Sequence, residues 1–308
     1  MKNVYHICFT SHEEVMFRDI EDHDMFVNLM ALQSFATGTE LLADAEMSTH
    51  VHQGIFTDNP MEFARRERMS YTKYFNYKYG REGRFGQKFT YVLLADGLYH
   101  ILTLLTYILR NGLHHAAAAT AFGYPFCSVR DMFPIDLGLS TEVAAPMARN
   151  DMVSYLPRHA EFPDSFQMNS RGVFVRNSFM ELRRAELFYS TPRNYLYQMN
   201  RLTDESWTRD QLKDKTGAPI TINDIEHADE RTVAQMLNNE YGRNFNRNRL
   251  QDIDICTLID KELIRPYGVA SVYQLTTSQK ERIARQLRYD FHVGEAQIAR
   301  CLVLPLPC

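Results

Sequence analysis

The sequence lacks the features that define several common protein classes. Its 308 residues include five widely scattered cysteines, and no two of them form a C-x-x-C pair. This spacing argues against a disulfide framework and against a cysteine zinc site. No stretch approaches the ~20 uninterrupted apolar residues of a membrane span. The most apolar stretch, 98–105, is interrupted by Tyr99, His100 and Thr103.

Charge bias and targeting signals are also weak. The 34 basic and 38 acidic residues give a formal net charge of −4, which excludes a uniformly basic nucleic-acid binder but leaves room for a local basic patch. Residues 1–8 contain no basic region followed by a sustained apolar run, so no signal peptide is expected. Together with the scattered cysteines, this predicts a cytoplasmic protein.

The order of apolar runs and turn residues predicts an α+β fold for residues 1–133. Asn59-Pro60 and Gly80 mark the ends of one helix, and Asn111-Gly112 is a stop signal for another. The expected strands are 4–10, 40–46, 49–56 and 88–94, and the expected helices are 22–35, 60–79 and 98–110. This order indicates a ferredoxin-like or RRM-like antiparallel sheet with helices on one face.

The rest of the chain divides into two further predicted parts. Residues 134–225 are interrupted by several prolines and indicate an extended connector with short helices, the clearest at 178–189. Residues 226–308 indicate a helical domain, with helices at 229–241 and 252–263 and a helix-turn-helix at about 278–304.

Two histidines in Thr49-His50-Val51-His52 are the first candidate for chemistry. Side chains at positions i and i+2 of a strand point to the same face, so both imidazoles can hold one divalent ion. Gly54 follows on the same face and leaves room for a close approach. The alternative is two polar residues on the solvent face of a strand.

Tyr107 and Asn111 form the second candidate, because residues at i and i+4 share one face of a helix. A phenol has a pKa of about 10 and needs help to act as a nucleophile. A nearby metal can supply it by polarising a phosphate, with the Asn111 carbonyl as a third ligand beside His50 and His52. The alternative is a core tyrosine near a capping asparagine. The other histidines singled out, His6, His100, His114 and His115, are expected to be ordinary surface residues.

Two further segments favour nucleic-acid binding. Residues 58–88 carry eight basic and four acidic residues interleaved with aromatics, a pattern typical of single-strand binding. Tyr71, Tyr74, Phe75 and the stem of Lys78 are expected on the core face instead. The second helix of the predicted helix-turn-helix would offer side chains to a major groove, although a plain helical packing unit is equally compatible. The candidate DNA-binding residues are Arg65, Arg66, Arg68, Lys73, Lys78, Arg81, Arg84, Lys88, Gln297 and Arg300.

Taken together, these segments resemble the REP-associated tyrosine transposases, a branch of the single-tyrosine HUH superfamily. The matching segments are 5–6 with 17–19, 47–52, 74–89, 107–111 and 124–128. Ser48-Thr49 departs from the usual Pro-Asn of that family, and Gly112 stands where the family generally has proline. The helix-turn-helix resembles an appendage of many members, whereas the region 134–225 has no counterpart.

The resemblance implies a metal-dependent DNA transposase or nickase. His50, His52 and Asn111 would hold Mg²⁺ or Mn²⁺ against single-stranded, hairpin-bearing DNA. Tyr107 would attack the phosphate and give a 5′-phosphotyrosine link with a free 3′-hydroxyl. The basic residues of 58–88 would grip the DNA backbone. With one tyrosine per chain, exchange of two strands needs two active sites or two rounds, so a homodimer is one option.

Two other functions remain open. A domesticated DNA hairpin-binding protein with the same fold would bind without metal-dependent nicking. A hydrolase would use a water nucleophile at the same metal and would need a carboxylate base, for which Glu46 is the only nearby candidate in the sequence. A covalent protein–DNA adduct separates the transposase from both.

Overall fold

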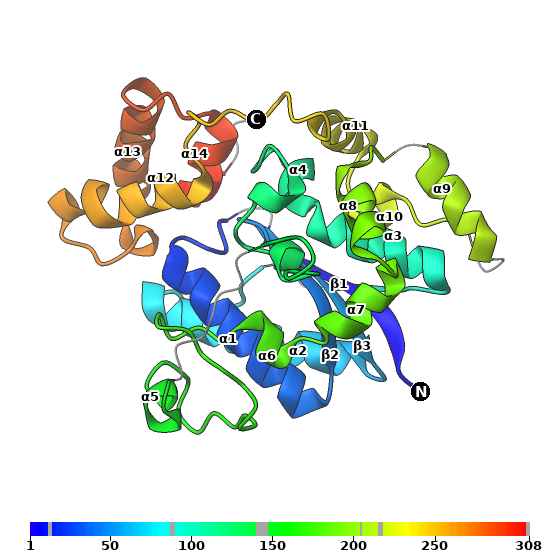
Figure 1. The fold of residues 1–308 in the computed structure, drawn as a ribbon. Coiled ribbons are helices and arrows are strands. Elements are labelled where there is room, and N and C mark those ends of the chain that lie inside the picture. The colour runs from blue at the N-terminus through cyan, green and yellow to red at the C-terminus, as the bar shows by residue number, and fades with distance from the viewer. Residues whose placement is uncertain (12–13, 87–89, 140–146, 204, 215–217, 306–308) are drawn as a thin grey trace.

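The computed structural model describes residues 1–11, 14–86, 90–139, 147–203, 205–214 and 218–305 (Figure 1). The elements that bear on the sheet and the site are β1 (Asn3–Thr10), α1 (Ile20–Thr37), β2 (Glu40–Glu46), β3 (His50–Thr57), α2 (Pro60–Tyr79), β4 (Tyr91–Leu94), α3 (Leu98–Leu109) and α4 (Asn111–His114). They are followed by α5 (Arg149–Val153), α6 (Arg176–Phe179), α7 (Leu182–Tyr189), α8 (Pro192–Asn200), α9 (Glu205–Gln211), α10 (Ile222–Glu226), α11 (Glu230–Asn239), α12 (Asp252–Leu258), α13 (Thr277–Tyr289) and α14 (Glu295–Leu302).

The four strands form one antiparallel sheet in the order β2-β3-β1-β4. In the β1–β3 pair, Thr10 lies opposite His50 and Asn3 opposite Thr57. The predicted α+β class with an antiparallel sheet is therefore confirmed. The strand expected at 88–94 is observed at Tyr91–Leu94, and residues 88 and 89 lie outside the described residues.

Helices α1 and α2 cover one face of the sheet. Helix α2 begins and ends as expected, because the Asn59 side chain accepts a hydrogen bond from the Glu62 N–H at its start and Gly80 takes a left-handed conformation at its end. The buried ring of Tyr71 packs edge-on against Phe26 of α1, with 5.2 Å between centroids. Since Gln53 of β3 donates to Glu67 of α2 at 2.6 Å, α2 lies on the face toward which Gln53 points.

Helix α3 covers the opposite face, so the expectation of helices on one face alone is corrected. The reason lies at Gly54, whose position leaves space for two α3 side chains: a Cβ there would lie 2.7 Å from Leu105 Cδ2 and 3.3 Å from Ile108 Cδ1. The expected stop at Asn111-Gly112 is only a break, because the chain continues as the single turn α4. At Gly112 a Cβ would collide with the side chain of Tyr124.

The segment expected to be a connector contributes to the same core as the sheet. Phe174, Tyr189 and Tyr195 are buried in one hydrophobic cluster that extends from Val4 to Met236. The helix expected at 178–189 is observed as α6 and α7, separated at Met180 and Glu181. The three-part division at residues 133 and 225 stays a prediction.

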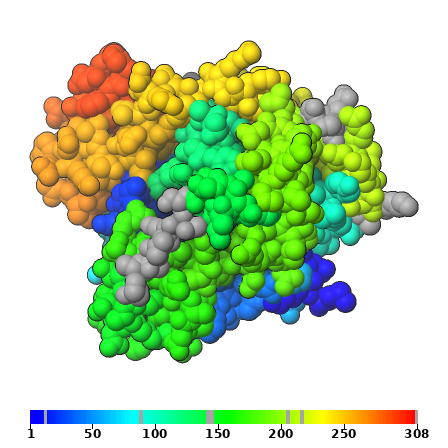
Figure 2. All heavy atoms as spheres, viewed as in Figure 1, coloured from blue at the N-terminus to red at the C-terminus, as the bar shows by residue number. Residues whose placement is uncertain are grey.

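Helices α12 to α14 enclose a second hydrophobic core, to which Val15 also contributes. In Figures 1 and 2 they form an orange-to-red lobe beside the remainder of the molecule. The fully buried Arg18 joins the two parts, because its guanidinium donates to both Asp260 oxygens at 2.8 and 2.9 Å and to the Cys301 carbonyl at 2.9 Å. Among the described residues, every helix is too short or too polar to cross a bilayer.

Candidate active site

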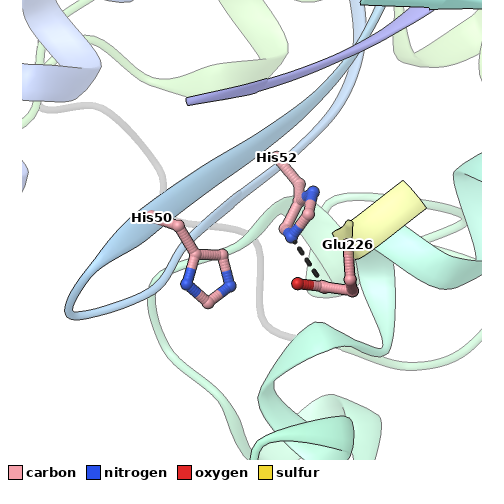
Figure 3. Close-up of side chains that lie close together, drawn as sticks. All are labelled: His50, His52 and Glu226. Carbon is pink, nitrogen blue, oxygen red and sulfur yellow. Dashed lines mark ion pairs between the residues drawn. The ribbon is translucent and has the colours of Figure 1, made fainter. Parts of the chain in front are cut away.

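The two histidines of β3 point to the α3 side of the sheet, as the i, i+2 spacing predicts (Figure 3). Their ring centroids lie 4.9 Å apart. Both imidazoles are buried, which excludes the alternative that they lie on a solvent-exposed face. Burial, together with the nearby His115, lowers the pKa of His50 well below its usual value, which favours the neutral imidazole that a metal requires.

A carboxylate that sequence reasoning missed completes this cluster. Glu226, the last residue of α10, places one oxygen 3.0 Å from His52 Nε2 and 3.6 Å from His115 Nε2. One ligand atom each from His50, His52 and Glu226 lies within 4.8 Å of the others. Burial alone would raise the pKa of Glu226, but the adjacent histidines hold it well below its usual value, so this carboxylate is ionised.

The candidate ligand Asn111 joins the same group. Its Oδ1 lies 3.2 Å from His50 Nε2, and its Nδ2 donates to Glu226 Oε1 at 3.3 Å. The break between α3 and α4 directs this side chain toward the sheet, although Tyr107 and Asn111 belong to successive helices.

The donor set fits a divalent cation. The buried Nε2 atom of His52 lies 3.0 Å from a Glu226 oxygen, whereas its Nδ1 contacts His6 Nε2 at 2.8 Å. This second contact fixes the ring and leaves Nε2 facing Glu226 (Figure 3). Two imidazoles with carboxylate and amide oxygens suit Mg²⁺, Mn²⁺ or zinc and do not select among them.

Tyr107 lies against this group and is fully buried. Its hydroxyl donates to Glu226 Oε1 and lies 3.8 Å from Met236 Sδ. The ring contacts His52 edge-on at 5.8 Å between centroids and stacks on His114 at 4.6 Å. Burial and the charge of Glu226 raise the pKa of the Tyr107 phenol well above its usual value.

The expectation that the neighbouring histidines are surface residues is wrong for three of them. His6, His100 and His114 are buried, and only His115 is partly exposed. His114 Nε2 contacts Glu240 at 2.7 Å, and the same carboxylate lies 3.2 Å from Arg110. Because α3 and α4 run between the sheet and α11, histidines that follow the tyrosine become enclosed.

The candidate basic residues of 58–88 lie in α2, on the far side of the sheet from His50 and His52, and in the segment that follows it. Two of them are held within the protein: Lys78 by Asp19 and Asp22 at 2.7 and 2.9 Å, and Arg81 by Glu14 at 2.7 Å. Arg65 pairs with Glu62, Arg66 contacts Gln33 and Glu62, and Arg68 contacts the Phe85 carbonyl, whereas Lys73 and Arg84 are exposed. Lys88 lies outside the described residues. DNA binding by this set stays a prediction.

The aromatics interleaved with these basic residues mostly belong to the core. Tyr71 and Phe75 are buried as expected, and Tyr79 and Phe85 are buried with them. Tyr77 is 91% exposed and is the ring best placed for stacking on a base.

The C-terminal helix pair places its candidate DNA contacts inward. Gln297 is buried and donates to Asp252 at 2.9 Å, and Arg300 binds the same carboxylate at 2.8 Å. The expectation that Gln297 reaches a DNA groove is therefore corrected, whereas DNA binding by the partly exposed Arg300 stays a prediction. Glu46 is corrected as well: it pairs with Val51 in the sheet register and so faces away from the histidines, and it binds His23 and Arg176 at 2.7 and 3.0 Å.

Comparisons with known proteins give little further guidance. No protein-family profile matches the sequence, and no curated protein matches it. Among solved structures, the chain is similar to a REP-associated tyrosine transposase bound to a REP hairpin, over 52% of this chain and 92% of that chain. The sequence identity is 13% and the TM-score is 0.37, which is a distant structural relationship and carries no argument about function.

Proposed function

We propose that this chain is a metal-dependent DNA nickase and strand transferase of the single-tyrosine HUH type. The observation that carries the proposal is the convergence of Tyr107, His52 and Asn111 on one oxygen of Glu226, with His50 beside them. These residues come from β3, α3, α4 and α10. A tyrosine, two imidazoles and a carboxylate at one point are suited to phosphoryl transfer.

The architecture supports the finer fold assignment. The element order β-α-β-β-α-β and the sheet order β2-β3-β1-β4 agree with a ferredoxin-like arrangement. In this arrangement the histidine strand is central, and the helix that follows β4 carries the tyrosine onto the same face.

In the proposed reaction, the Tyr107 oxygen attacks a DNA phosphate in line with the bond to the 3′ oxygen. The phosphorus–O3′ bond breaks, the phenol proton passes to Glu226, and the leaving 3′ oxygen takes up a proton from water. A divalent ion held by His50, His52, Glu226 and Asn111 would neutralise phosphate charge during transfer. The products are a 5′-phosphotyrosine ester and a 3′-hydroxyl, and the reverse reaction rejoins the strand without a nucleoside triphosphate.

Access to the tyrosine requires a movement. Tyr107 is 0% exposed, and both Glu226 and Met236 contact its hydroxyl. A phosphodiester therefore reaches this oxygen only after α10 and α11 shift away from α3. This burial is also the observation that favours the alternative function, a hairpin-binding protein that no longer cleaves DNA.

The deciding experiment detects the covalent intermediate. The protein is incubated with 3′-end-labelled single-stranded DNA that contains a hairpin, with Mn²⁺, Mg²⁺ or EDTA, and is resolved on a denaturing gel. We expect a labelled protein band that requires metal and disappears in Tyr107→Phe. DNA binding without this band would establish the non-catalytic alternative, and cleavage without it would establish a water nucleophile.

A further inference from the structure

We propose that a cavity beside His50 binds one nucleotide of single-stranded DNA, adjacent to the phosphate held at the candidate metal centre. This inference rests on the proposed function and names a substrate subsite for it. The cavity, called here the His50 cavity, has a volume of about 450 Å³. That volume lies within the range of about 300–1,000 Å³ found for ligand pockets and is too small for a duplex.

Four parts of the chain line the His50 cavity, one of them Phe17 and His23 around the start of α1. Of the other three, the first is the β2–β3 link with the start of β3, and the second is the segment that follows α4. The third is the C-terminal lobe, which no sequence motif connected with the histidines. The lining residues include Ser48, His115, Tyr124, Phe126, Arg249 and Asp252.

The cavity and the candidate metal centre share two histidines. His50 and His115 line the cavity, whereas Tyr107 and Glu226 do not. The rings of His50 and His115 lie 4.7 Å apart. His115 Nε2 is buried and lies 3.6 Å from Glu226. A strand in the cavity would therefore present its next phosphate to the two histidines at the edge of the candidate metal centre.

Asp252 fixes the wall of the His50 cavity that the C-terminal lobe forms. Its carboxylate accepts hydrogen bonds from Ser48 at 2.8 Å, Gln297 at 2.9 Å and Arg300 at 2.8 Å. The Ser48 contact ties this wall to the β2–β3 link. Because Arg300 pairs with Asp252, its charge offsets one of the two carboxylates that line the cavity. The other, Asp254, accepts the backbone N–H of Gln251 at 2.9 Å.

Arg249 supplies an available cation at the cavity. It is exposed, and its Nε contacts Gln297 Oε1 at 3.3 Å. Within the described chain its two terminal nitrogens make no hydrogen bond or ion pair, so both can donate to a phosphate. Arg249 ends the segment 242–249, which contains three arginines, three asparagines and no acidic residue.

Aromatic side chains complete a nucleotide-binding surface across from Arg249. Phe126 is half-buried and stacks on His23 with 3.6 Å between ring centroids, and Tyr124 meets it edge-on at 5.7 Å. Aromatic rings for the base and arginine for the phosphate are the combination used to bind single strands. The His50 cavity has both the aromatic rings and the arginine, although the net charge of the whole chain gives no indication of a nucleotide-binding surface.

The test measures binding without chemistry. A fluorescein-labelled 12-nucleotide single strand of randomised sequence is titrated in EDTA and followed by fluorescence anisotropy. Arg249→Ala should weaken binding about five- to tenfold and lower the salt-dependence slope by about 0.7, the value for one lost phosphate contact. Arg247→Ala is the matched control, since this exposed arginine is in the same segment but does not line the cavity. It should change the affinity less than twofold.

A second variant and a crosslink make the result specific to the cavity. Ala117→Phe fills the cavity without changing charge and should weaken binding as Arg249→Ala does, with its fold checked by circular dichroism. A strand containing 4-thiothymidine should crosslink to peptides that contain Phe126 or Arg249. Equal losses in both arginine variants, unchanged binding in Arg249→Ala, or crosslinks confined to α2 would overturn the inference.

The outcome is separable from that of the proposed function. If wild-type protein forms the covalent adduct while Arg249→Ala binds normally, the subsite is wrong and the nickase stands. If the cavity variants lose binding while wild-type protein forms no adduct, the subsite stands and the nickase is wrong.

Discussion

Glu226 accepts a hydrogen bond from the phenol of Tyr107 although the two residues are 119 positions apart in the chain. The same carboxylate oxygen lies 3.0 Å from His52 and 3.3 Å from Asn111. Glu226 is therefore the point at which the candidate nucleophile meets the candidate metal ligands. Its contacts make two roles available, as an oxygen ligand and as the acceptor of the phenol proton.

Replacing this carboxylate by an amide shows whether Glu226 takes part in the reaction or only covers Tyr107. Glu226→Gln keeps the size and the hydrogen-bond acceptor but loses the proton acceptor and the negative charge. We expect adduct formation to fall by about 10²–10⁴-fold, the usual contribution of a general base, measured as the rate of appearance of the labelled protein band. Glu230→Gln, exposed at the start of α11, is the control. A faster reaction in Glu226→Gln would mean that Glu226 blocks the site.

Local signals in the sequence predicted the framework of this site well. Asn59-Pro60 and Gly80 give the ends of α2 because capping and the left-handed turn are local interactions. The shared face of His50 and His52 follows from the strand period alone. Side-chain convergence with Tyr107 was expected from the resemblance, and the structure brings these groups together.

Contacts between distant segments could not be predicted in this way. The sequence near Glu226 marks a helix, through the cap at Thr221, but no pattern says that its end reaches β3. Lys78 had the same sequence signal as a free cation, yet Asp19 and Asp22 neutralise it from another helix. Gln297 has the spacing of a groove-reading residue, and its use by Asp252 depends on how α12 and α14 pack.

The contact between His6 and His52 predicts that His6 affects metal binding. His6 Nε2 contacts His52 Nδ1 at 2.8 Å and so holds the ring with Nε2 toward Glu226. His6→Phe keeps the ring size but removes this partner. We expect Mn²⁺ affinity, measured by isothermal titration calorimetry, to fall about 10- to 100-fold, as is usual for such outer partners.

The matched control for this variant is His100→Phe. His100 is also a buried histidine of the same core region, but neither of its ring nitrogens has a hydrogen-bond partner among the described residues. Its replacement should leave Mn²⁺ affinity unchanged. Equal affinities in the His6 and His100 variants would contradict the assigned role of His6.

Gly54 sets how closely α3 approaches the sheet. In Gly54→Ala the new methyl would lie 2.7 Å from Leu105 Cδ2 and 3.3 Å from Ile108 Cδ1. We expect a loss of about 1–3 kcal/mol in the free energy of unfolding, measured by urea denaturation, because the core is overpacked. Leu105→Ala removes the side chain that the new methyl would meet. The double variant should therefore lose less free energy of unfolding than the two single variants lose in sum. If the losses of the two single variants simply add, the new methyl does not press on Leu105.

A buried carboxyl on the other face of the sheet makes stability depend on pH. Burial, with the charge of Asp44, raises the pKa of Glu67 to about 8, against the opposing effect of its hydrogen bond from Gln53. In the unfolded chain this group titrates near a pKa of about 4.3. Between these values the folded protein keeps the proton that the unfolded chain releases. Its contribution to stability is therefore complete below about pH 4 and is lost as the pH rises toward 8.

Replacing Glu67 by glutamine should remove this dependence, because the amide is neutral at every pH and can still accept the hydrogen bond from Gln53. In wild-type protein the free energy of unfolding should fall by up to about 1.4 kcal/mol per pH unit within this window. Glu67→Gln should flatten that slope and be the more stable protein at pH 8, as measured by urea denaturation from pH 5 to 9. Glu82→Gln, an exposed carboxyl beyond the end of α2, should leave the slope unchanged. A wild-type slope that persists in Glu67→Gln would mean that Glu67 is ionised in the fold, with its charge balanced by groups other than Gln53.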